Sequence, residues 1–192
     1  MKKITLLAAL LVGGLVTTNA QVNVETPKLS AKVGTTPIKK GNWMVGSNIS
    51  KIGYSFENKS FEFMLKPTAG YFISDGIAVG LEVGGGIKTQ KKPLKDQWTY
   101  TVSPFVRYYF PEGASSTGRF FGQGNIGVEG AEGGESKNSF AFGINAGYSH
   151  FLSRNVALEA MAGYNYSKAN TDGAEKQSGL GVAIGFQIFL GK

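Results

Sequence analysis

The last segment of the chain, residues 179–190, alternates large apolar side chains with smaller ones. The even positions hold Leu180, Val182, Ile184, Phe186, Ile188 and Leu190. Successive side chains of a β-strand point to opposite faces, whereas a helix would spread these six residues around its circumference. The segment is therefore predicted to be a strand with one apolar face.

Seven earlier segments follow the same period of two, less sharply in the first, second and fifth. They are residues 42–52, 60–73, 77–84, 98–110, 119–130, 139–148 and 156–167. Most exceed the five or six residues typical of globular proteins and match the roughly 9 to 11 that a transmembrane strand needs. An open sheet edge in lipid would leave backbone groups unsatisfied. The sequence thus predicts an all-β fold, an eight-stranded antiparallel up-and-down transmembrane β-barrel.

Composition agrees with a narrow barrel and excludes several kinds of site. Glycine supplies 28 of 192 residues, and the inward positions are rich in small side chains, which an eight-stranded barrel requires. One histidine and no cysteine exclude zinc sites built on these residues, thiol catalysis and disulfides. The net charge of +7 is scattered rather than gathered in a stripe, so we expect no nucleic-acid partner.

The N-terminal residues have the pattern of a signal peptide. Lys2 and Lys3 precede an apolar run over residues 4–16, and small residues ending at Ala20 offer a cleavage site. The run is too short for a transmembrane helix, which needs about 20 residues. We predict a signal peptide at 1–20, a loosely ordered periplasmic N-terminal arm at 21–40 and the barrel at 41–192.

Short and long connections alternate along the chain. The short turns are residues 74–76, 111–117 and 153–155, and the longer polar loops are 53–59, 90–96, 131–138 and 170–177. Both termini of an even-stranded barrel lie on the short-turn side, which faces the periplasm. The four loops are therefore expected outside the cell.

Aromatic residues on the apolar face fall into two groups, as in the girdles at the two membrane interfaces. Beside the loops we expect Phe61, Phe63, Trp98, Tyr100, Phe140, Phe142, Tyr164 and Tyr166. Beside the turns we expect Trp43, Tyr71, Tyr108, Phe110, Phe120 and Tyr148.

Charged residues also occupy the inward positions. They are Glu62, Lys66, Glu82, Lys88, Arg107, Arg119, Glu129 and Glu159. Charges in so narrow a space persist when they are paired, which favours a salt-bridged plug with waters between the side chains. The alternative is a gated or very small ion path, although eight strands leave no continuous channel without rearrangement.

Other motifs give no chemistry. Residues 122–127 match GxGxxG, but no helical pattern follows the segment. His150 has no serine and acid that could complete a triad. Glu129, Glu132 and Glu135 could bind a divalent cation among lipopolysaccharide phosphates, but a solvated loop is the simpler interpretation. We predict no catalytic residue, cofactor or metal.

Taken together, the signal peptide, the eight segments, the turns and the girdles resemble the small outer-membrane β-barrel family of the OmpA membrane domain, OmpX and OmpW, over residues 41–192. The resemblance implies an outer-membrane location and insertion by the barrel-assembly machinery, which reads a terminal aromatic residue. Here Phe189 lies three residues before the end. Pro67 and Pro104 each remove a ladder donor, so we expect a bulge or a water-satisfied carbonyl there.

The expected function is that of a non-enzymatic integral outer-membrane protein. Its loops would serve surface interaction or envelope integrity, and its partners would be outer-membrane lipid and lipopolysaccharide, with the protein a monomer. The main alternative is a porin-like pore for small solutes or ions. A third, a lipid-modifying enzyme, would need a nucleophile and a base near the outer rim.

Overall fold

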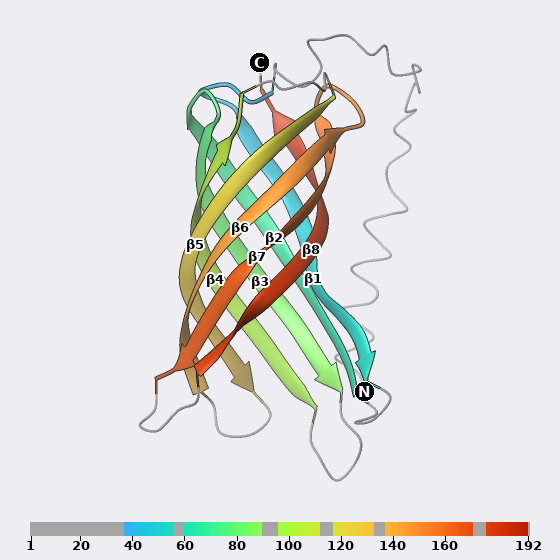
Figure 1. Ribbon diagram of the computed structural model, residues 1–192, viewed down its shortest axis with the longest axis vertical. Helices are drawn as coiled ribbons and strands as arrows, with labels where there is room; N and C mark the ends of the chain where they lie inside the picture. Colours follow the sequence, from blue (N-terminus) through green and yellow to red (C-terminus); the bar gives the residue numbers. More distant parts are fainter. Residues whose placement is uncertain are drawn as a thin grey trace.

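The computed structural model describes residues 37–55, 60–89, 96–111, 117–132, 137–170 and 176–191. They form eight strands: β1 (Trp43–Ser55), β2 (Ser60–Ser74), β3 (Ile77–Thr89), β4 (Gln97–Tyr109), β5 (Gly118–Glu132), β6 (Lys137–Phe151), β7 (Val156–Ala169) and β8 (Lys176–Leu190). Each strand pairs antiparallel with the next, and β8 pairs with β1 to close the barrel (Figure 1). The predicted fold class is confirmed. The predicted signal peptide and most of the predicted arm lie outside the described residues.

The strands are 13 to 15 residues long and keep the alternation that the sequence indicates. In β4, Thr101, Ser103 and Phe105 are buried while Val102 and Val106 are exposed. Buried positions point into the barrel, and exposed apolar positions form its outer face. Within the described ranges, no helix is long and apolar enough to cross a membrane.

The two ends of the barrel differ. The turn end carries the β2–β3, β4–β5 and β6–β7 connections together with residues 37–42 and Gly191, and it is uppermost in Figure 1. The loop end carries the other four connections. Residues 56–59, 90–95, 133–136 and 171–175 of the predicted loops lie outside the described residues.

The last residues of the predicted arm pack against the turn end. The Lys40 backbone N–H donates to Asp75 Oδ1 at 2.8 Å, and the Gly76 N–H donates to the Ile38 carbonyl at 3.2 Å. Gly76 has a φ of 78°, which favours glycine. The side chain of Ile38 is buried. The β2–β3 turn therefore anchors the chain where it enters the barrel.

The prolines do not cause bulges, so that part of the expectation is wrong. The register runs unshifted through Pro67 opposite Ser47 and through Pro104 opposite Leu81. A proline φ fits an extended strand, so the residue removes a donor without displacing the chain. The register shifts lie elsewhere, at Ile49/Lys51 in β1 and at residues 72–74 in β2.

Candidate functional site: the barrel interior

An apolar cluster fills the turn end of the barrel. Ring centroids lie 5.6 Å apart between Tyr109 and Phe121 and 5.4 Å apart between Phe151 and Phe189. The members come from all eight strands and the entering chain: Ile38, Met44, Phe72, Ala78, Tyr109, Phe121, Phe151, Ala157 and Phe189. All of them are buried, so we call this cluster the apolar plug.

Close packing at this level depends on small residues. A Cβ atom added to Gly147 of β6 would overlap the ring of Phe121 on the neighbouring β5. In the cross-strand pair Phe121–Gly147, the glycine has no side chain and so leaves room for the phenylalanine ring in the narrow interior. This packing explains part of the glycine excess.

A buried ion pair lies beside the apolar plug. Arg107 on β4 donates through Nη1 to both carboxylate oxygens of Glu159 on β7, at 3.0 and 2.8 Å. The carboxylate also accepts from Tyr109 Oη at 3.2 Å and from Ser149 Oγ at 2.6 Å. Both charged side chains are almost wholly excluded from solvent. Three neighbours thus hold the negative charge of Glu159.

The network continues across the barrel. Arg107 Nε donates to Gln123 Oε1 at 2.7 Å, and Gln123 Nε2 donates to Glu82 Oε1 at 3.0 Å. The guanidinium carbon of Arg107 also lies 4.2 Å from the ring centroid of Phe121. Side chains from β3, β4, β5, β6 and β7 are therefore tied together. We call Glu82, Arg107, Tyr109, Gln123, Ser149 and Glu159 the polar network.

The structure brings together only some of the eight predicted lumenal charges. Arg107 and Glu159 form an ion pair, and Glu82 joins them through Gln123. Arg119 is buried at the turn end, where its Nη1 donates to the Gly118 carbonyl at 3.0 Å.

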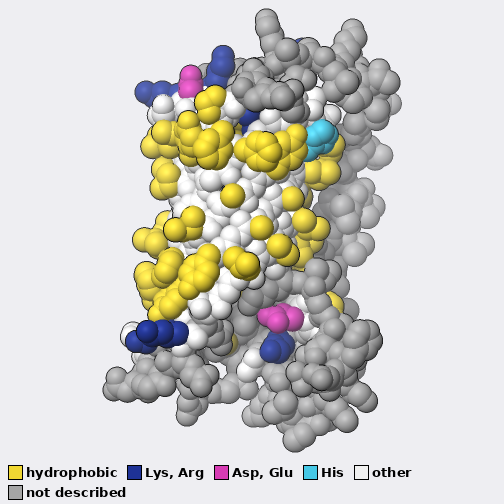
Figure 2. Space-filling model, viewed as in Figure 1, with side chains coloured by type: hydrophobic (Ala, Val, Ile, Leu, Met, Phe, Trp, Pro, Cys, Tyr) yellow, Lys and Arg dark blue, Asp and Glu magenta, His cyan; other side chains and the backbone are white. Residues whose placement is uncertain are grey.

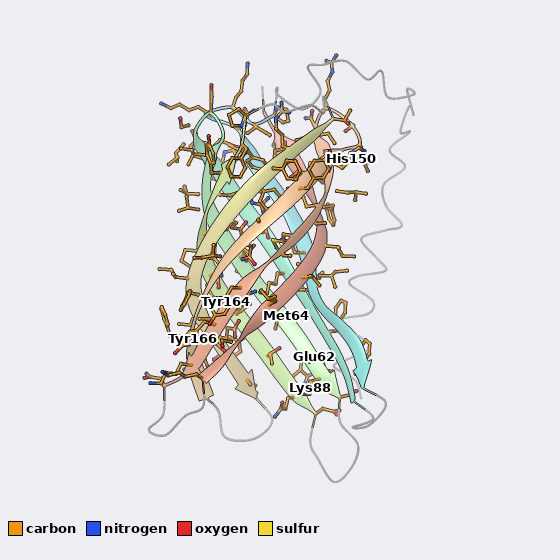
Figure 3. All side chains as sticks on the ribbon, in the orientation of Figure 1. Glu62, Met64, Lys88, His150, Tyr164 and Tyr166 are labelled. Atoms are coloured by element: carbon orange, nitrogen blue, oxygen red, sulfur yellow. The ribbon has the colours of Figure 1, made fainter. Side chains whose placement is uncertain are left out.

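The remaining four predicted charges lie in the loop half. Glu62 and Lys88 are direct cross-strand neighbours on β2 and β3, near the loop end (Figure 3). Lys66 and Glu129 line a cavity described below.

Sequence reasoning missed the uncharged members of the polar network. Tyr109, Gln123 and Ser149 stand on inward positions of their strands, and that parity was the available signal. The predicted lumenal residues were all charged, so these three were not among them.

A cavity of about 310 Å³ occupies the loop half of the barrel, on the loop side of the polar network. Glu82 and Gln123 belong to both and bound the cavity on the turn side. The inward lining mixes polar side chains with apolar ones such as Met64 and Met161; the polar ones include Lys66, Ser103, Asn125, Glu129, Asn145 and Asn165. Asn145 Nδ2 donates to Asn125 Oδ1 at 3.3 Å. The interior therefore has three levels: the apolar plug, the polar network and the cavity.

On the outer face seen in Figure 2, hydrophobic side chains gather toward the upper and lower ends and are scattered over the middle, and charged side chains lie at the two ends. Among the predicted girdle residues, the rings of Trp43 and Tyr71 lie 5.1 Å apart at the turn end, and those of Phe142 and Tyr166 stack at 5.0 Å in the loop half. Phe63, Phe142, Tyr148 and Tyr166 are half-buried. The other predicted girdle residues are exposed: Trp43, Phe61, Tyr71, Trp98, Tyr100, Tyr108, Phe110, Phe120, Phe140 and Tyr164.

The other candidate motifs lie on the barrel wall. Residues 122–127 are part of strand β5, which continues to Glu132. His150 is exposed near the turn end, 6.4 Å from Tyr148 between ring centroids (Figure 3). Within the described ranges, no group of three His, Cys, Asp or Glu side chains could hold a metal ion; Glu135 falls outside these ranges.

A closed antiparallel barrel whose exposed outer face is apolar and whose charged side chains turn inward defines a transmembrane β-barrel. The sequence matches the model of the outer membrane protein β-barrel domain over residues 6–192. The chain belongs to this family and is an outer-membrane protein. A comparison with curated protein sequences gives no significant match.

Solved structures share the fold. Neisserial surface protein A (NspA) is 22% identical, with a TM-score of 0.55 over 77% of this chain and 95% of its own. OprG from Pseudomonas aeruginosa is 14% identical, with a TM-score of 0.53 over 80% of this chain and 98% of its own. The N-terminal β-barrel domain of P. aeruginosa OprF is 11% identical, with a TM-score of 0.53 over 79% and 98%. The resemblance to small outer-membrane barrels is confirmed at the level of fold.

Proposed function

We propose that this protein is a non-enzymatic outer-membrane barrel that does not conduct and that serves surface interaction or envelope integrity through its loop end. The observation that carries the proposal is the burial of Arg107, whose guanidinium is bonded to Glu159, Tyr109 and Gln123 across the barrel. A conducting pore needs a water-filled path along its axis. The polar network and the apolar plug stand in that path.

The position of the lone histidine supports a role without catalysis. A triad needs its base within hydrogen-bond reach of a nucleophile. His150 is on the outward face of β6 near the turn end, whereas the cavity opens in the loop half. The proposal therefore includes no catalytic residue and no cofactor.

The proposal also includes the expected surroundings of the barrel. The protein would be exported by the signal peptide at 1–20, inserted by the barrel-assembly machinery and stable as a monomer. Its girdles would contact outer-membrane lipid and lipopolysaccharide. Exposed aromatic side chains at both ends of the strands support this placement, because such rings favour membrane interfaces.

Conductance across planar bilayers tests the closure. We expect the refolded chain to show no steady current, because a path past Arg107 requires the polar network to break. Urea unfolding of the same sample, for the wild type and for Glu159→Lys, provides the stability control. A steady, voltage-independent current, with a cation preference that reverses in Glu159→Lys at an unchanged urea midpoint, would show that the barrel is a pore.

A further inference from the structure

The barrel closes only partly between its first and last strands. The β1–β8 ladder runs from Trp43 opposite Leu190 to Ile49 opposite Ile184, and the register of β1 shifts just beyond it. The β7–β8 ladder continues as far as Lys168 opposite Lys176. In the described strands, residues 176–183 of β8 therefore have ladder partners on β7 alone. Figure 1 shows β1 and β8 diverging toward the loop end.

The backbone N–H and C=O groups along this open edge of β8 require hydrogen-bond partners. In an antiparallel strand, every second residue turns its N–H and C=O toward the same neighbouring strand. Those groups of residues 176–183 face the β1 side without a ladder partner among the described residues. Unsatisfied backbone groups in lipid cost several kcal/mol each. An occupant that donates and accepts hydrogen bonds would be stabilised there.

The cavity of the loop half reaches this edge. Its lining includes Ser50 on β1 and residues 178–183 on β8, the two flanks of the opening. It includes inward residues of β8, such as Gly181, and also the outward Leu180 and Val182. The cavity thus extends to both flanks of the opening. In Figure 3 the side chains of Glu62, Met64 and Lys88 lie in the view between β8 and β1.

The two sides of the opening differ in polarity. Inside, amide, hydroxyl and carboxylate groups, among them those of Asn125, Asn145 and Asn165, lie beside Met64 and Met161. Outside are Leu180 and Val182, which are 90% and 73% exposed and are the most exposed of the described large apolar side chains. A molecule with a polar head and an apolar chain would satisfy both sides at once.

The lining also constrains the head group. The cavity lining has two carboxylates, Glu82 and Glu129, and one ammonium group, Lys66. Its net negative charge disfavours an anionic head group. Amides offer donors and acceptors together, which matches hydroxyl groups. About 310 Å³ holds roughly ten waters at about 30 Å³ each, enough for one sugar-sized head and too little for a folded partner.

We propose that the opening between β1 and β8 is a lateral binding site for an amphiphile with an uncharged, hydroxylated head group. The head enters the cavity from the membrane, and the acyl chain stays outside along Leu180 and Val182. The site lies in the loop half, on the loop side of the polar network, so it does not depend on whether the barrel conducts. Conductance tests the closure of the axis, and the labelling experiment below tests the lateral site.

The test uses an alkyl glucoside with a photoactivatable diazirine on the carbon next to the sugar. The chain is refolded in phosphocholine vesicles that contain the probe, irradiated, digested and mapped by mass spectrometry. We expect labelling of inward positions that line the cavity, such as Gly181 and Asn145. Probes with the same alkyl chain and a phosphate or trimethylammonium head should label these positions at least fivefold less.

Two matched variants separate the site from general lipid contact. Gly179 lines the cavity and Gly124 lies on the outward face of β5, and a Cβ at either meets no atom within 4 Å. Gly179→Trp should reduce cavity labelling at least fivefold, whereas Gly124→Trp should leave it unchanged.

Three outcomes would overturn the proposal. The first is labelling of outward positions alone, and the second is equal labelling with charged heads. The third is a dimer that a bifunctional cross-linker, added to a parallel sample, joins through residues 176–183, which would show that a second copy of the chain occupies the edge.

Discussion

Glu159 is the residue on which most of the buried polar contacts converge. Its carboxylate accepts from Arg107, Tyr109 and Ser149, and Arg107 in turn holds Gln123. A buried pair contributes little beyond a well-packed apolar pair, but the loss of one partner leaves an uncompensated charge. Stability at this site therefore depends on keeping both charges.

Glu159→Ala should lower the free energy of unfolding by about 3 to 5 kcal/mol, because it leaves the buried Arg107 guanidinium without its counter-charge. Urea titration of the protein in lipid vesicles, followed by tryptophan fluorescence, measures the effect. Glu132→Ala, at an exposed position on β5, is the control and should change stability by less than about 0.5 kcal/mol. Equal effects of the two substitutions would contradict the structural role of the polar network.

Strand β8 shows how one element serves two environments. Its even residues contact the membrane side, and its odd residues Ala183, Gln187 and Phe189 are buried inside. A shift of one residue in register would exchange these faces. Charge on the outward face should therefore be costly, with a cost that depends on depth in the bilayer.

Ile184→Arg should destabilise the barrel by about 2 to 4 kcal/mol, the value for arginine near the bilayer midplane. Leu190→Arg is the matched control on the same face, at the strand end, where the expected cost is about 0 to 1 kcal/mol. Urea unfolding in vesicles compares the two variants. A larger cost at Leu190 would show that the bilayer midplane lies closer to the turn end than the girdles indicate.

At the scale of the whole molecule, all the barrel connections fall into two sets at opposite ends. The turn end holds the apolar plug and the docked residues 37–40, and the loop half holds the cavity. Strand β7 links the two ends, with the exposed Arg154 just before it and the exposed Lys168 near its close.

Lys168→Cys on intact cells should react with a membrane-impermeant maleimide, and Arg154→Cys should react only after lysis. The reason is that the loop end faces outward when both barrel termini are periplasmic. The protein has no native cysteine, so the background is low. The opposite labelling pattern would invert the orientation.

The sequence by itself determined the strands and their faces. Period-two alternation assigns each side chain in β4, β6, β7 and β8 to the lumen or the membrane, because a pleated strand has only two sides. Strand length and the need to satisfy every backbone group in lipid then require closure. The fold class and the eight strands followed from these two constraints, and the lengths of the polar segments between the strands indicated the alternation of turns with loops.

Only the tertiary structure decided which inward residues meet. Arg107 and Glu159 are 52 residues apart in sequence, and their pairing depends on their height in the barrel as well as their face. Height is set by register and stagger summed around the closed sheet, which side-chain parity does not encode. For the same reason, the sequence does not predict the bulge at Ile49/Lys51, the burial of Phe189 in the apolar plug or the incomplete ladder between β1 and β8.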